Sequence, residues 1–301
     1  MLSETEEIDN ILNSAGKILI EKNIKFDEDD IVILDEYLSF TYYKNEKFRN
    51  EINKLKIKFN KKLNINLCEQ KIVKNTSCLS LVHTLDLSGC ENITDVDELG
   101  SVHILDLSCC CSIKDVKNLN NVYDLSLDYC DNVTDVSMLG KVHKLSLCEN
   151  ENELDVSNLG SVYDLNLCGC NFLIGTSSLE FVHTLDLSCT YIEDVSMLGG
   201  VHTLNLSDCE NIKNVDRLSS VYNLNLSNCN LENINNLKYV YKLNLSGCES
   251  LINVSGLQSV HELNLSKCNN ISDVSMLHSV RILNLTFCKK IKDIGNLRNL
   301  E

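Results

Sequence analysis

The stretch "VHTLDLSGCENITDVDELGS", residues 82–101, decides the fold because the chain repeats it. The next twenty residues, "VHILDLSCCCSIKDVKNLNN" (102–121), have the same form, and nine more repeats follow. The opening valines are Val82, Val102, Val122, Val142, Val162, Val182, Val201, Val221, Val240, Val260 and Val280. Self-similarity at one short, fixed period is typical of proteins built from stacked structural repeats.

The pattern within one repeat predicts its local structure. We number the positions of each repeat from its opening valine, which is position 0. Positions 3 and 5 of the repeat that starts at Val82 are therefore Leu85 and Leu87. Val-x-x-Leu-x-Leu predicts a short strand whose alternate residues point inward. Ile93, Val96 and Leu99 then follow at every third residue, a spacing typical of a tight 3₁₀-like return leg. Because one repeat cannot bury its own leucines, the sequence predicts a solenoid of stacked repeats around one long core.

The motif Val-x-x-Leu-x-Leu-x-x-Cys resembles the signature of leucine-rich repeats. The continuations "CENITDV", "CDNVTDV" and "CNNISDV" resemble the cysteine-containing class found in F-box substrate adaptors. The regular 20-residue length is more similar to leucine-rich repeat families of large DNA viruses. The resemblance covers residues 62–301 and implies an α/β solenoid, with a parallel β-sheet on one face and 3₁₀ or turn return legs. It implies an architecture and does not imply an activity.

The ends of the chain depart from the repeat. Residues 62–81 read as a degenerate capping repeat, with Ile65 and Leu67 at strand positions and Leu79 on the return leg. About twelve repeats therefore fill residues 62–301. The last repeat is polar and basic, and an uncapped end there would allow end-to-end self-association.

Residues 1–61 are predicted to form a small helical segment, with helices near residues 8–19, within 28–43 and within 45–58. Phe48, Ile52 and Leu55 align along the third helix. Two roles are open for this segment. It could cap the first repeat, or it could be an F-box-like module, although an F-box typically opens with Leu-Pro and this chain contains no proline.

The charge distribution favours some partners over others. The net charge is −16, and residues 81–301 hold 29 acidic against 14 basic residues. Such a surface repels nucleic acid and anionic membranes and is complementary to basic protein surfaces. The sequence shows no secretory signal and no membrane-spanning apolar run. We therefore expect an intracellular protein of the cytoplasm or nucleus, with its cysteines reduced.

Cysteines and histidines form two columns. A cysteine stands at position 8 in nine repeats: Cys90, Cys110, Cys130, Cys170, Cys209, Cys229, Cys248, Cys268 and Cys288. A histidine stands at position 1 in six: His83, His103, His143, His183, His202 and His261. Buried thiols and stacked rings account for both columns, because catalysis would need one histidine unlike the others. The runs "CCC" (109–111) and "CGC" (168–170) alternate across a strand, so their side chains should diverge. We predict no catalytic residue, no metal site and no cofactor.

The exposed face of the strands is the expected binding surface. Residues at positions 2 and 7 vary between repeats, whereas position 4 is always Asn, Asp or Ser and position 6 is mostly Ser. We expect side-chain ladders at positions 4 and 6, and a partner-specific surface at positions 2 and 7. The candidate partner-binding residues are Asp86, Asp106, Asp124, Tyr129, Asp164, Asp186 and Asp208.

The leading hypothesis is a non-enzymatic scaffold that binds a basic protein partner on this face. The alternative is an F-box-like substrate adaptor, whose helical N-terminus recruits a ubiquitin ligase. An enzyme is not indicated, because we find no phosphate loop, nucleophile elbow or zinc motif in the sequence.

Overall fold

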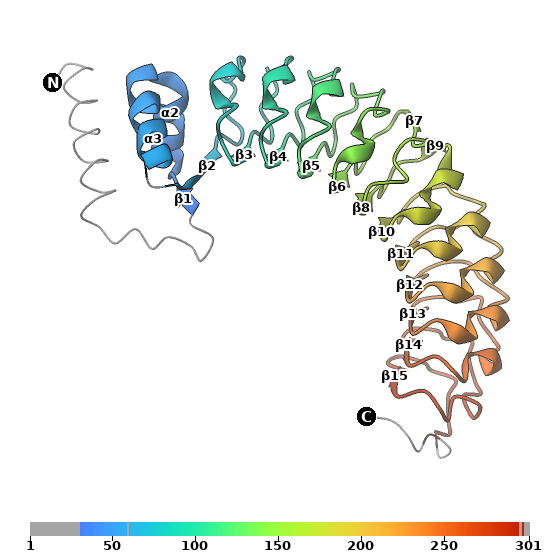
Figure 1. Cartoon of the computed structure of the whole chain (residues 1–301). Coiled ribbons are helices and arrows are strands. Elements are labelled where there is room, and N and C mark those ends of the chain that lie inside the picture. Colours follow the sequence, from blue (N-terminus) through green and yellow to red (C-terminus); the bar gives the residue numbers. More distant parts are fainter. Residues whose placement is uncertain (1–30, 59, 295–296, 298–301) are drawn as a thin grey trace.

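The structure is a computed structural model that describes residues 31–58, 60–294 and 297. The chain forms a curved solenoid with its strands along the inner, concave side and its return legs along the outer side (Figure 1). Thirteen strands form one parallel sheet, and twelve of these belong to the repeats. Those twelve are β2 (Lys62–Asn66), β3 (Thr84–Asp86), β4 (Ile104–Asp106), β5 (Asp124–Ser126), β6 (Lys144–Ser146), β8 (Asp164–Asn166), β10 (Thr184–Asp186), β11 (Thr203–Asn205), β12 (Asn223–Asn225), β13 (Lys242–Asn244), β14 (Glu262–Asn264) and β15 (Ile282–Asn284). The predicted parallel sheet is confirmed.

The repeats pair in register along the sheet. Leu85 lies opposite Leu105, and Leu185 lies opposite Leu204 although that repeat is one residue shorter. The missing residue is therefore absorbed in the return leg and not in the strand. The leucines at positions 3 and 5 are buried in one continuous core from β2 to β14. A one-residue slip would turn these leucines to solvent, which explains why the register is kept.

The return legs are mostly 3₁₀ helices, as the three-residue apolar spacing predicts. Those of the described residues span Ser77–Leu79, Asp97–Leu99, Lys117–Leu119, Leu139–Lys141, Thr176–Phe181, Ser196–Gly200, Asp216–Ser220, Asn235–Tyr239 and Ser255–Leu257. Two adjacent repeats differ, because their return legs form a second, two-stranded parallel sheet of β7 (Glu153–Asp155) and β9 (Phe172–Ile174). This second sheet was not predicted from the sequence.

The N-terminal segment differs from the prediction in one element. Residues 31–33 form β1 (Ile31–Ile33), which pairs in parallel with β2, and no strand was expected in this segment. Helix α2 (Glu36–Lys44) starts after this strand, where the Asp35 carboxylate accepts a hydrogen bond of 2.8 Å from the Leu38 N–H. The helix predicted near residues 8–19 lies outside the described residues.

Helices α2 and α3 (Glu46–Lys58) close the first end of the core (Figure 1). Tyr42 and Phe48 are fully buried in the same cluster as the strand leucines. The Tyr42 hydroxyl donates to Asn53 at 2.8 Å, and the Arg49 guanidinium donates to the Tyr42 carbonyl at 2.9 Å. The two helices thus bury their apolar side chains on each other and on the first repeat.

Candidate functional site

The strand face carries a regular network at position 4. Each Asp or Asn there accepts the backbone N–H two residues later, as Asp86 does from Ser88 at 3.0 Å. Some of these residues also bond to the preceding repeat: the Asn205 amide donates to Asp186 and the Asn225 amide to Asn205, each at 2.8 Å. The position 4 residues therefore fix the turn after each strand and link neighbouring repeats. This is the ladder expected from their uniformity.

Position 7 has an unusual backbone. In every repeat from Val82 onward the residue there has a positive φ, between 56° for Glu149 and 74° for Gly247. Only three of these residues are glycine: Gly89, Gly169 and Gly247. The other eight adopt the left-handed conformation at an expected cost of about 1 to 2 kcal/mol each. Side chains as large as Tyr129 and Phe287 stand there, 51% and 69% exposed.

The seven predicted partner-binding residues divide into two groups. Asp86, Asp106 and Asp186 are position 4 residues, and each accepts hydrogen bonds from the N–H and hydroxyl of the serine two residues later. Their carboxylates are thus partly used inside the chain. The other four lie at the variable positions: Asp124, Tyr129, Asp164 and Asp208.

These four residues make few internal contacts. Asp164 pairs with Lys144 of the preceding repeat at 3.3 Å, and Asp208 accepts the Asn228 amide at 2.9 Å. Tyr129 and Asp208 are exposed, while Asp124 and Asp164 are half-buried in β5 and β8. All four side chains are therefore at least partly exposed to solvent.

The rings at position 1 form one stack along the rim of the sheet. Ten successive rings, from His83 to His261, have centroids 4.4 to 4.8 Å apart. All neighbouring pairs are stacked except His83 and His103, which are tilted by 51°. Burial and then the nearby Lys62 lower the pKa of His83. The six histidines thus all belong to one ring stack, and none of them has a distinct catalytic partner in it.

The thiols at position 8 form a second column inside the core. Each donates to the carbonyl of the position 5 leucine in the preceding repeat, as Cys130 does to Leu107 at 3.1 Å. Burial is the main cause that raises the pKa of Cys90 and Cys170 to about 11 and of Cys130 to about 12. These thiols remain protonated at neutral pH, so they are poor nucleophiles. All sixteen cysteines lie within the described residues and are free thiols.

Asn150 and Thr190, which replace the cysteine in two repeats, still make hydrogen bonds in its place. The Asn150 amide donates to the Cys130 and Val133 carbonyls at 3.1 Å each. The Thr190 hydroxyl donates to the Leu187 carbonyl at 2.7 Å. A hydrogen-bond donor at this position is therefore kept throughout the column.

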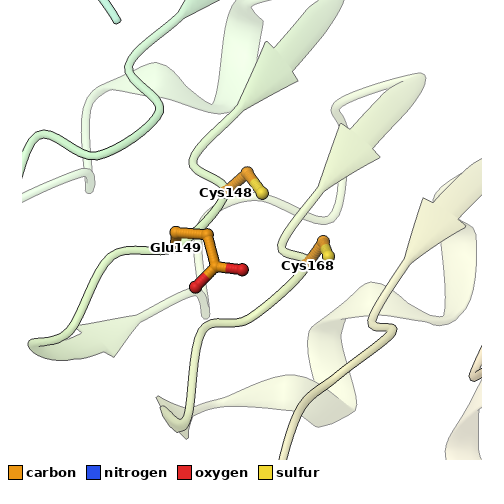
Figure 2. Close-up of side chains that lie close together, drawn as sticks. All are labelled: Cys148, Glu149 and Cys168. Carbon is orange, nitrogen blue, oxygen red and sulfur yellow. The ribbon is translucent and has the colours of Figure 1, made fainter. Parts of the chain in front are cut away.

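One group of side chains was not predicted. Cys148, Glu149 and Cys168 come from two neighbouring repeats, and one potential ligand atom of each lies within 4.8 Å of the others. Figure 2 shows the two thiols and the carboxylate gathered at the ends of adjacent strands. Cysteine runs within one repeat were considered from the sequence, whereas this group forms between repeats. The signal in the sequence was the replacement of the usual serine at position 6 by cysteine in two successive repeats.

Comparison with protein-family models and with curated proteins finds no match. Solved structures do match. An internalin of Listeria monocytogenes aligns over 79% of this chain and 77% of its own, with 20% identity and a TM-score of 0.58. A chain of the mouse RP105/MD-1 complex has the same identity and TM-score over 79% of this chain and 49% of its own.

The fold is that of a leucine-rich repeat solenoid. A further match is the functional domain of InlJ from Listeria monocytogenes, which includes a cysteine ladder. It covers 80% of this chain and 60% of its own, with 16% identity and a TM-score of 0.54. At such identities the likeness shows the fold of the leucine-rich repeats. Among the described residues, none of the helices is long and apolar enough to cross a membrane.

Proposed function

We propose that this leucine-rich repeat protein is a non-enzymatic scaffold that binds a protein partner with a basic surface on its strand face. The observation that carries the proposal is position 7. Eight repeats hold a non-glycine residue in the left-handed conformation there, although three repeats use glycine. Backbone strain kept at variable, exposed positions is typical of sites that serve binding.

Charge and fold support the same proposal. Asp124, Asp164 and Asp208 place carboxylates on a chain region with 29 acidic and 14 basic residues. Such a field speeds the encounter with a positively charged partner and disfavours acidic ones. Leucine-rich repeat proteins commonly bind other proteins, and one structurally similar chain belongs to a two-protein complex. We also propose that the protein acts in the cytoplasm or nucleus. We further propose that its repeats are of the type found in large DNA viruses.

The adaptor alternative receives less support from the helices. An F-box-like module must offer its helices to a ligase subunit, whereas Tyr42 of α2 and Phe48 of α3 are fully buried in the core. These contacts favour a capping role for α2 and α3. Co-purification of the full chain with a Skp1-like protein would speak for the adaptor.

A charge-reversal experiment tests the proposed surface. Asp124→Lys, Asp164→Lys and Asp208→Lys are combined in one variant of the full chain. The control carries Glu151→Lys, Glu193→Lys and Glu232→Lys, which change three exposed acids on the return legs by the same charge. Affinity capture from cells that contain the protein, followed by quantitative mass spectrometry, compares both variants with the unmodified chain.

We expect a protein that is captured by the unmodified chain and the control but is reduced about tenfold or more with the strand-face variant. Capture should also weaken as salt is raised. If all captured proteins bind both variants equally, the strand face is not the binding surface.

A further inference from the structure

The group of Cys148, Glu149 and Cys168 is positioned by the repeat itself. Strands β6 and β8 pair with Ser146 opposite Asn166, and the two cysteines stand two residues further along. Both therefore occupy position 6 of neighbouring repeats. In seven other repeats this position holds serine: Ser88, Ser108, Ser188, Ser207, Ser227, Ser246 and Ser266.

The carboxylate of Glu149 is brought to the thiols by two backbone features. Glu149 itself is left-handed, with φ of 56°, and its N–H donates to the Cys168 carbonyl at 2.7 Å. Its side chain then lies over Gly169, where a Cβ would come within 2.6 Å of the carboxylate carbon. The missing side chain of Gly169 thus leaves the space that the carboxylate fills beside Cys168.

The surroundings of the group are rich in negative charge. The Asp128 carboxylate accepts the Cys148 N–H at 2.8 Å and also the Ser146 hydroxyl. Burial, followed by the Cys168 thiol and Asp128, raises the pKa of Cys148. Burial and the same Cys168 thiol raise the pKa of Cys189, in the next repeat, to about 11. Burial and these neighbouring groups therefore disfavour ionisation of the Cys148 and Cys189 thiols.

Two thiols and a carboxylate that lie this close together can bind one ion of the zinc type. Zinc binds sulfur at about 2.3 Å and carboxylate oxygen at about 2.0–2.2 Å. We propose that Cys148, Cys168 and Glu149 bind a thiophilic divalent cation of the zinc class. The fourth coordination position is open to water. The cation would replace the thiol protons, so both cysteines bind as thiolates and two protons are released per ion. This proposal does not depend on the proposed binding of a protein partner.

Cobalt(II) is a suitable probe, because it accepts the same ligands as zinc and its thiolate complexes absorb light. The full chain, reduced and freed of metal with a chelator, is titrated with Co²⁺. We expect one equivalent to bind with a thiolate-to-cobalt charge-transfer band, and excess Zn²⁺ to abolish that band. The apparent affinity should rise with pH, because binding competes with thiol protons.

Variants assign the signal to the site. Cys148→Ser and Cys168→Ser should each abolish the band, and Glu149→Gln should weaken binding about tenfold or more. The serine variants should fold, because serine is the usual residue at position 6, and circular dichroism checks this. Cys111→Ser, which removes an exposed thiol outside the group, should leave the titration unchanged.

Three results would overturn the proposal. They are the absence of a charge-transfer band, a band that persists in Cys148→Ser or Cys168→Ser, and a disulfide between these two cysteines found by mass spectrometry under the reducing conditions of the titration.

Discussion

At the scale of single residues, His83 couples the stability of the ring stack to pH. Its pKa is lowered below the ordinary 6.5 by burial and by the neighbouring Lys62, His103 and Lys56. The unfolded chain therefore binds more protons at this site than the folded chain as the pH falls through 6.5. The stabilising effect of neutral His83 is present above that pH and is lost below it.

We predict that the free energy of unfolding falls between about pH 7 and pH 5, and that the fall is smaller in His83→Tyr. Tyrosine is the matched replacement because four other repeats have it at position 1. Urea unfolding at several pH values measures the effect. An equal fall in both proteins would show that His83 is not perturbed.

A second residue-scale prediction concerns the buried thiols. Cys130→Ala removes a buried sulfur and its hydrogen bond to the Leu107 carbonyl, which still accepts the Cys110 N–H. The carbonyl is not left unsatisfied, so we expect a loss of about 1 to 2 kcal/mol in the free energy of unfolding. The control Cys111→Ala, at an exposed thiol, should change it by less than about 0.5 kcal/mol. Equal losses would argue against a packing role for the thiol column.

At the scale of elements, Gly175 determines how β9 passes into the following 3₁₀ helix. Its φ is +75°, and a Cβ there would lie 2.0 Å from the Ser157 hydroxyl oxygen and 2.9 Å from the Ser157 nitrogen. Gly89 also has a positive φ, +69°, but its nearest neighbour would be 3.2 Å away in the flexible Glu69 side chain.

Gly175→Ala should therefore destabilise the protein by more than about 2 kcal/mol, and Gly89→Ala by about 1 kcal/mol. Both variants share the backbone strain, so the difference between them measures the steric clash. Thermal or urea unfolding is sufficient for the comparison. Similar losses would mean that β7 and β9 can separate to admit the side chain.

The elements also show which features a sequence of this kind reveals. Strands and 3₁₀ legs were predictable because the spacing of Leu85 and Leu87 recurs in every repeat and that of Val96 in most of them. Strand β1 was not predictable from the sequence, because its three residues form a strand only by pairing with β2, about thirty residues further along the chain. The proximity of Cys148 to Cys168 also depends on the register between repeats, which no single repeat contains.

At the scale of the whole molecule, stability is a sum over neighbouring repeats. The leucine core, the thiol column and the ring stack each connect one repeat to the next. The curved strand face follows from this stacking, and with it the surface that presents Asp124, Tyr129 and Asp164.

Amide hydrogen exchange, followed residue by residue by NMR, tests the in-register stacking most directly. The N–H groups of Leu127 and Tyr129 donate to carbonyls of the following repeat at 2.9 Å, and their counterparts do the same along the solenoid. We predict slow exchange at these two positions in the repeats from residue 82 to about residue 270, slowest in the central repeats. Fast exchange at positions 5 and 7 across the central repeats would contradict the stacked structure.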